Sequence, residues 1–234
     1  MDRFRHLVLW DVGGVLLRLN YGQFYDEGAR LSGRLTRGQF KDAYIGSRID
    51  YRAMKGELDK AGFVSELRRI LGRPVAEADA KKLLRLSLGR LYPPAIELKE
   101  RAYRSEYPVG VLSNASQMVH EILKDDFPEA VETFSYENPS VFSYQVGAVK
   151  PEDAIYRAVP KFDEVTFIDD KVSYVRKAID DFGWNGILFT PIIDKEEAIR
   201  AGHNDARKPG KNFSEAGSME QLAEALNRFG ISLL

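Results

Sequence analysis

The sequence of 234 residues predicts an α/β fold, with a parallel sheet at the core and a helical cap inserted after the first strand. Two observations carry this prediction. From residue 92 onward, short continuous apolar runs, typical of strands buried on both faces, alternate with amphipathic segments. One such run stands apart near the N-terminus, and the 70 residues after it have helical spacing. At roughly 150 residues per domain, the length predicts one to two domains.

The isolated first strand is expected at residues 6–10, where HLVLW ends in Asp11, Val12 and two glycines. Apolar residues then recur at helical spacing between residues 20 and 90, in segments separated by glycines. The spacing of Leu83, Leu84, Leu86 and Leu88 extends the last helix of this block to Leu88. We therefore expect four or five short helices in this stretch and no strand.

The second half of the chain alternates between strands and helices. Strands are expected at residues 109–112, 165–168 and 187–189, with extended segments at Phe134 and 141–144. Helices are expected at residues 95–104, 117–124, 154–159, 172–182 and 217–227, and the polar residues 194–216 as a mobile surface loop. This order predicts a Rossmann-like core made of residues 1–17 and 92–234, with residues 18–91 as the cap domain.

Composition excludes several classes of protein. The chain has no cysteine, which rules out a disulfide scaffold and a cysteine-based zinc site. Its formal net charge of -1 argues against nucleic acid or an anionic membrane as partner. No apolar run approaches the ~18 residues of a membrane-spanning helix. The N-terminal apolar stretch breaks at Asp11, so we expect no signal peptide and a cytoplasmic protein.

Charge is unevenly distributed along the chain. Residues 1–110 contain 21 Lys and Arg against 14 Asp and Glu, and the remaining residues contain 13 against 21. Solvated helix faces are the simpler explanation. The alternative is a basic half that faces an acidic, metal-binding half with an anionic substrate between them.

Polar residues follow the predicted strands where each strand ends. In an open parallel α/β sheet, ligands bind beyond the carboxyl ends of the strands. The strand ends contribute Asp11, Ser113, Asn114, Asp169 and Asp170, and the loop before a following helix contributes Lys150. Three neighbouring carboxylates repel one another unless a cation neutralises them, and Mg²⁺ prefers such oxygen ligands. A carboxylate beside Mg²⁺ and a lysine is suited to nucleophilic attack on phosphorus.

Taken singly, most of these residues have a simpler explanation. An Asp after a buried strand is often a helix N-cap, Ser113-Asn114 is typical of a turn, and Lys150 is typical of a surface. The adjacent acids Asp169 and Asp170 are harder to explain without a cation. The order and context of all the residues together favour a site.

The four segments WDVGGVL, VLSNAS, VGAVKPEDAIY and FIDDKVSYVRKA carry these residues. In order and spacing they resemble the four motifs of the haloacid dehalogenase (HAD) superfamily, and the resemblance covers nearly the whole chain. The helical block between the first two motifs resembles the helical cap of that superfamily. The resemblance implies a Mg²⁺-dependent phosphatase that hydrolyses a small phosphorylated metabolite.

The resemblance also implies a role for each site residue. Asp11 is expected to be the nucleophile that forms an aspartyl-phosphate. The Asp11 side chain, the Gly13 backbone carbonyl and Asp170 are expected to hold Mg²⁺, while Asp169 binds through water or orients the site.

The same resemblance places the phosphoryl group of the substrate. Ser113 and Lys150 are expected to contact that group, and Gly14 and Asn114 to line the same cavity.

One position departs from the pattern of the superfamily. Its phosphatases usually carry a second Asp two residues after the nucleophile, and here that position is Gly13. The missing acid would protonate the leaving alcohol, and such general acid catalysis accelerates a reaction by ~10²–10⁴. Asp169, a water molecule at the metal and the substrate itself are the open alternatives for a replacement.

Three hypotheses follow from Gly13. The favoured one is a phosphatase, because D-x-G-G-V variants resemble enzymes acting on sugar phosphates such as glucose 1-phosphate. The leaving group of such an anomeric phosphate is better than that of an ordinary alkyl phosphate, so its departure depends less on an acid. The second is a catalytically impaired HAD domain that binds a phosphorylated ligand or a protein. The least favoured is a dehalogenase-type hydrolase, because the chain retains Asp169 and Asp170 and lacks an obvious halide-binding set near Asp11.

The cap is expected to select the substrate, because it closes over the phosphate site. Its basic residues are Arg30, Arg34, Arg37, Lys41, Arg48, Arg52 and Lys55, of which one or two are candidates to reach the anion. Tyr51 and Arg52 are the weakly favoured specificity residues.

Overall fold

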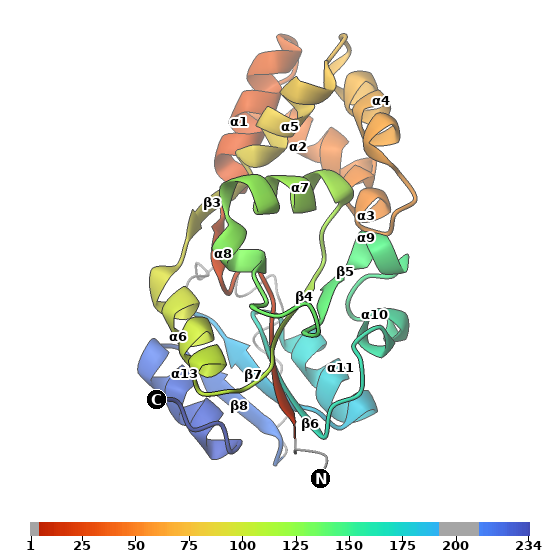
Figure 1. Ribbon diagram of the computed structural model, residues 1–234. Helices are drawn as coiled ribbons and strands as arrows, with labels where there is room; N and C mark the ends of the chain where they lie inside the picture. The colour runs from red at the N-terminus through yellow and green to blue at the C-terminus, as the bar shows by residue number, and fades with distance from the viewer. Residues whose placement is uncertain (1–4, 192–210) are drawn as a thin grey trace.

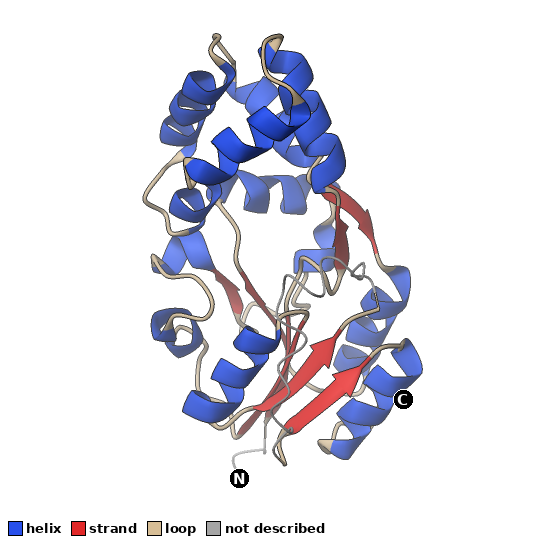
Figure 2. Cartoon of the chain, turned by 180° about the vertical axis from the view of Figure 1, so that it is seen from behind, coloured by secondary structure: helices blue, strands red, loops and turns tan. Residues whose placement is uncertain are grey.

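In the computed structural model, which describes residues 5–191 and 211–234, the core is a six-stranded sheet with every strand parallel to its neighbours (Figure 2). The strand order is β5-β4-β1-β6-β7-β8. The strands are β1 (His6–Trp10), β4 (Val109–Ser113), β5 (Ser140–Phe142), β6 (Glu164–Asp169), β7 (Asn185–Phe189) and β8 (Phe213–Ala216). The predicted α/β class with a parallel sheet is confirmed.

Helices cover both faces of this sheet, which explains why β1 is apolar throughout. Side chains alternate between the faces of a strand, so Val8 and Trp10 join one hydrophobic cluster while Leu7 and Leu9 join another. The first cluster includes residues of α6 (Pro93–Arg104) and α13 (Met219–Arg228), and the second includes residues of α10 (Asp153–Arg157) and α11 (Val172–Phe182). No helix in the described part of the chain is long and apolar enough to cross a membrane.

The insert after β1 forms a separate helical layer above the sheet (Figure 1). Its helices are α1 (Tyr21–Ser32), α2 (Arg37–Gly46), α3 (Ile49–Met54), α4 (Lys60–Leu71) and α5 (Glu77–Arg85). Between this layer and the sheet lies α7 (Gln117–Asp126), followed by the short helix α8 (Pro128–Val131) and, after β5, by α9 (Ser143–Val146).

Two short strands missed by the sequence analysis connect the helical layer to the core. β2 (Leu17–Leu19) pairs antiparallel with β3 (Leu88–Leu91), and α5 ends at Arg85, so the prediction of a helix through Leu88 is wrong. The leucine spacing was locally compatible with a helix. The pairing partner lies about 70 residues away in the chain, so no local pattern reveals it.

The C-terminal predictions need two further corrections. Residues 187–189 are not the last strand, because Phe213–Ala216 forms β8 beside β7; it is a short strand with few apolar residues. Of the predicted loop 194–216, residues 194–210 lie outside the described residues. Phe134 is not extended but sits in a bend with φ of 63°, where its backbone N–H donates to Glu132 Oε1 at 2.6 Å.

Oppositely charged side chains join the helical layer to the core. In each of four ion pairs the cation comes from the insert and the carboxylate from the core, three of them on α7. The N···O distances are 3.1 Å for Lys55–Glu152, 3.0 Å for Lys60–Glu121, 2.7 Å for Lys81–Asp125 and 2.5 Å for Arg85–Asp126. These pairs are partly exposed, so each contributes only ~0–1 kcal/mol. They account for part of the uneven charge distribution in the sequence.

Candidate active site

The register of the sheet brings the first and fourth motifs together. Trp10 pairs with Ile168, and the backbone N–H of Asp11 donates to the Ile168 carbonyl at 2.9 Å. Asp11 therefore lies beside Asp169 at the carboxyl ends of β1 and β6. Trp10 also pairs with Val111 of β4, which ends at Ser113 on the other side of β1.

Lys150 connects the two carboxylates. Its Nζ lies 2.9 Å from Asp11 Oδ1 and 2.6 Å from Asp169 Oδ2, and it donates to the Leu112 carbonyl at 2.9 Å. Burial alone would lower the pKa of this lysine, but Asp11 and Asp169 outweigh burial and raise the pKa. Lys150 is 1% exposed, so it is a buried cation held in its charged form.

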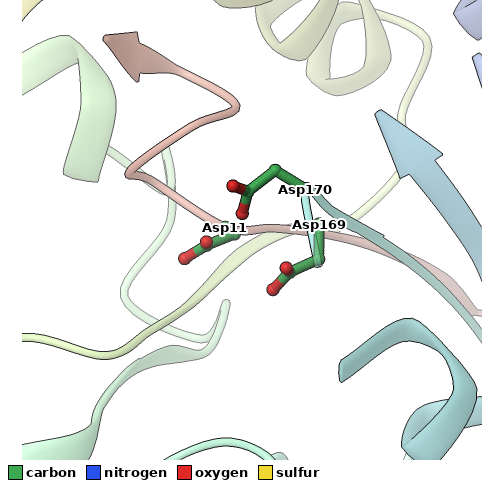
Figure 3. A group of neighbouring side chains, drawn as sticks. All are labelled: Asp11, Asp169 and Asp170. Carbon is green, nitrogen blue, oxygen red and sulfur yellow. The ribbon is translucent and has the colours of Figure 1, made fainter. Parts of the chain in front are cut away.

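The carboxylates of Asp11, Asp169 and Asp170 form a compact buried group (Figure 3). One oxygen from each lies within 4.8 Å of the others. Burial raises the pKa of Asp169 to about 6, although Lys150 opposes the shift. Burial, together with the charges of Asp169 and Asp11, raises the pKa of Asp170 well above its usual value.

The group fits a hard divalent cation. Asp170 Oδ1 is buried and has no hydrogen-bond partner among the described residues, whereas Asp169 Oδ1 accepts from the Lys171 backbone N–H at 2.8 Å. A buried carboxylate oxygen without a partner is costly unless a cation binds it. Oxygen-only ligands at this spacing suit Mg²⁺.

Two glycines shape the chain around these carboxylates. Gly14 has φ of +86°, and a Cβ there would lie 2.5 Å from Asp170 Oδ2, so only glycine fits. At Gly13 φ lies outside the left-handed region, and the three atoms nearest to a Cβ all belong to the Leu19 side chain, the closest being Cδ2 at 3.3 Å. The geometry therefore does not require glycine at position 13.

The second and third motifs meet through Asn114. Its side chain accepts from the Lys150 backbone N–H at 2.8 Å and donates to the Lys150 carbonyl at 3.3 Å. Asn114 thus fixes the segment that carries Lys150. Ser113 is buried at the end of β4, and both residues line the same cavity as Asp11.

A cavity of about 550 Å³ extends from these residues toward the helical layer. The core contributes Asp11, Gly13, Ser113, Asn114 and Lys150, which were all predicted for one site. The insert contributes a mostly apolar and aromatic surface, formed by Leu19, Tyr21, Phe24, Tyr44, Tyr51, Met54, Leu84 and Leu88.

The basic residues of the insert do not reach this cavity. Among the described residues that line it, Lys150 and Lys171 are the only Lys or Arg, and both belong to the core. Arg52, one of the two weakly favoured specificity residues, pairs instead with Glu66 at 3.3 Å, while Tyr51 does line the cavity. No arginine or lysine of the cap lines this cavity in the described part of the chain, so the lining gives no support to the hypothesis that one of them contacts an anionic substrate.

Sequence reasoning missed three charged residues of the cavity. Lys171 follows the two acids of the fourth motif directly, and Glu152 follows Lys150-Pro151, so position next to a motif could have indicated both. Asp50 in the insert had no such indication, because only the tertiary fold places α3 over the core.

Comparison with known proteins shows the same fold in solved structures. No protein-family model and no curated protein sequence matches the chain. A HAD family enzyme from Bacteroides thetaiotaomicron is similar over 79% of this chain and 93% of its own, with 22% identity and a TM-score of 0.64. Another structure of that enzyme, described as a complex with magnesium and inorganic phosphate, has 22% identity and a TM-score of 0.63 over the same shares of the two chains.

More distant structures of different activity have this fold too. A HAD phosphatase from Thermococcus onnurineus is 15% identical over 98% of this chain and all of its own, with a TM-score of 0.59. The L-2-haloacid dehalogenase from Xanthobacter autotrophicus is 16% identical over 96% of this chain and 99% of its own, with a TM-score of 0.55. At these identities the likeness shows a shared fold: a parallel sheet with a helical insert after its first strand, as in HAD enzymes.

Proposed function

We propose that this protein is a Mg²⁺-dependent phosphatase of the HAD superfamily that hydrolyses a small phosphorylated metabolite through an aspartyl-phosphate on Asp11. One observation carries the proposal: Asp11, Lys150, Asp169 and Asp170 form a buried charged group, of which Asp11 and Lys150 line a cavity of about 550 Å³. Such a group has no evident structural purpose, because three buried carboxylates near one another are unfavourable without a ligand.

Asp11 is the nucleophile in this mechanism. Its carboxylate oxygen attacks phosphorus, the P–O bond to the leaving group breaks, and an acyl phosphate forms on Asp11. Water then attacks that phosphorus and releases inorganic phosphate, which restores the carboxylate. Lys150, at 2.9 Å from Asp11 Oδ1, orients the nucleophile and stabilises negative charge on the transferring group.

The side chains of Asp11 and Asp170, with the Gly13 backbone carbonyl, would hold the magnesium ion, and Asp169 would orient the site. When bound, the ion supplies Lewis-acid stabilisation of charge on the phosphoryl oxygens. Ser113 would donate a hydrogen bond to the phosphoryl group, and Gly14 and Asn114 keep the surrounding backbone in position.

Gly13 restricts the substrates that this mechanism handles well. With no acid at that position, the leaving group must depart with little help from a proton. Phosphates on an anomeric carbon have a better leaving group than ordinary alkyl phosphates. We therefore place sugar 1-phosphates among the favoured substrates.

In this proposal residues 18–91 act as a cap domain on a core made of residues 1–17 and 92–234. The cap covers the phosphate site and excludes water from it. The cavity it shares with the core selects the leaving group of the substrate.

A second candidate is a catalytically impaired domain that binds a phosphorylated ligand or a protein partner. Gly13 is the observation that favours it, because the superfamily's usual acid is absent. The retained set of Asp11, Lys150, Asp169 and Asp170 favours catalysis instead. A dehalogenase-type reaction is less favoured, because it needs neither a metal nor this group of carboxylates.

The test is Mg²⁺-dependent release of phosphate from p-nitrophenyl phosphate and from glucose 1-phosphate. Nitrophenolate departs without a proton, so the first substrate reports the nucleophile and metal alone. We expect turnover that requires Mg²⁺ and is lost in Asp11→Asn, while Asp180→Asn, on the exposed part of α11, retains it. Absence of turnover on both substrates, with Mg²⁺ and a phosphate mimic still bound, would favour the impaired domain.

A further inference from the structure

The cavity has a pronounced separation of charge. Its described cations, Lys150 and Lys171, both lie at the end that holds the carboxylate group of the core. On the side of the insert, the charged lining residue is Asp50, near the start of α3. Apart from Ser87, the rest of that side is apolar or aromatic. A substrate whose phosphate sits at Asp11 therefore presents the other part of its leaving group to aromatic rings and one carboxylate.

Contacts with the core fix the position of Asp50. The next residue, Tyr51, donates from its hydroxyl to Glu152 Oε1 at 3.1 Å, and Lys55 pairs with the same oxygen at 3.1 Å. Glu152 follows Lys150 by two residues. These two contacts hold α3, the helix that carries Asp50, against the core segment that carries Lys150.

Two further carboxylates line the cavity, Asp50 from the insert and Glu152 from the core, and they differ in their partners. Glu152 is neutralised by Lys55. Asp50 Oδ1 instead accepts a hydrogen bond of 2.5 Å from the Tyr44 hydroxyl, a neutral donor. Burial raises the pKa of Asp50 to about 6, and only the Tyr44 hydrogen bond opposes it. At neutral pH Asp50 is mostly ionised and lacks a compensating cation among the described residues.

We propose that Asp50, positioned by Tyr44, forms a second subsite that binds an ammonium or hydroxyl group on the leaving group of the substrate. The same carboxylate disfavours substrates that carry a second anionic group, such as phosphorylated acids or bisphosphates. The body of the leaving group packs against Phe24, Tyr51 and Met54. This inference rests on the proposed function, since that function places the phosphate at Asp11.

The test uses four ligands that differ only at one end. They are benzylphosphonates with a para aminoethyl, hydroxyethyl, ethyl or carboxymethyl group, which mimic aryl phosphates but are not hydrolysed. Dissociation constants are measured by calorimetry with Mg²⁺ present. A charge-assisted hydrogen bond is worth roughly 10- to 100-fold in affinity. We expect a donor ligand to bind at least about 10-fold more tightly than the ethyl ligand, and the carboxymethyl ligand to bind most weakly.

Asp50→Asn is the decisive variant, because asparagine keeps an oxygen for the Tyr44 hydroxyl and removes only the charge. We expect it to reduce the advantage of the aminoethyl over the carboxymethyl ligand by about 10-fold or more. Asp42→Asn, on the exposed surface of α2, should leave all four affinities unchanged. The order of the aminoethyl and hydroxyethyl ligands distinguishes an amine from an alcohol as the natural group.

Equal affinities for the four ligands, or an unchanged ratio in Asp50→Asn, would overturn the subsite. The proposed function is tested separately by turnover of p-nitrophenyl phosphate in the unmodified protein. Turnover without selectivity rejects the subsite alone. Selective binding without turnover rejects the phosphatase and retains the subsite.

Discussion

Restoring an acid at position 13 is the most direct test of the chemistry. In the proposed mechanism Gly13→Asp supplies the proton donor that the site lacks. The three atoms nearest to a Cβ at Gly13 all belong to the half-buried Leu19 side chain, the closest at 3.3 Å, so a small shift of that side chain would accommodate the Cβ. Gly13 and Leu19 both line the cavity, so we expect a carboxyl group at position 13 to lie next to the substrate.

The expected gain follows from the role of the missing group. General acid catalysis contributes ~10²–10⁴ in rate, which corresponds to about 3–5 kcal/mol of barrier. The new carboxyl group would join Asp11, Asp169 and Asp170.

The assay compares three substrates by steady-state phosphate release with Mg²⁺. Ethyl phosphate has the poorest leaving group, glucose 1-phosphate an intermediate one, and p-nitrophenyl phosphate needs no proton. Gly13→Asp should therefore raise kcat most for ethyl phosphate, by about 10² or more, less for glucose 1-phosphate, and hardly at all for p-nitrophenyl phosphate.

Gly13→Asn is the matched control, since asparagine has the same size and no acidic proton. It should give no gain on any substrate. An equal gain on all three substrates, or the same gain with asparagine, would refute the role assigned to position 13. A gain confined to p-nitrophenyl phosphate would also contradict it.

Three further predictions concern stability and metal binding. Asp170→Asn should raise the apo free energy of unfolding, because burial and the neighbouring carboxylates raise the pKa of Asp170 and make its ionised form unfavourable, and it should abolish stabilisation by Mg²⁺ in thermal melts. Gly14→Ala should weaken Mg²⁺ binding, because the new Cβ would lie 2.5 Å from Asp170 Oδ2. Gly33→Ala is the control: Gly33 also has a positive φ, of +65°, but a Cβ there would have no described atom within 4 Å. It therefore tests backbone strain alone and should leave Mg²⁺ affinity unchanged. Burial lowers the pKa of Lys99 to about 8 from 10.5, so the folded state binds fewer protons in that window and stability should rise with pH between 8 and 10.5, by up to about 3 kcal/mol. Lys99→Met should remove this rise in denaturant titrations, and a rise that persists would assign it to another group.

The uneven charge of the sequence illustrates how a pattern can have a structural explanation beside its functional interpretation. The basic residues of the insert suggested contact with an anionic substrate. In the structure, four of them pair with acids of the core, and none lines the cavity among the described residues. Composition records how many charges a segment has, but their direction depends on which helix faces pack together.

By itself, the sequence determined the α/β class, the parallel sheet and the helical insert after the first strand. The reason is that buried parallel strands and amphipathic helices have different local periodicities. The polar residues at the strand ends could also be assigned to one site from the order of the strands alone, because parallel strands bring their carboxyl ends to the same edge of a sheet. The structure brings four of these residues together in one buried group: Asp11, Lys150, Asp169 and Asp170.

Tertiary structure alone decided the contacts between distant segments. The pairing of β2 with β3, the edge strand β8 and the arrival of Asp50 at the cavity depend on segments far apart in the chain. Each of these elements is too short or too ordinary in composition to have a pattern of its own. Their positions follow from how the larger elements pack, which no local periodicity records.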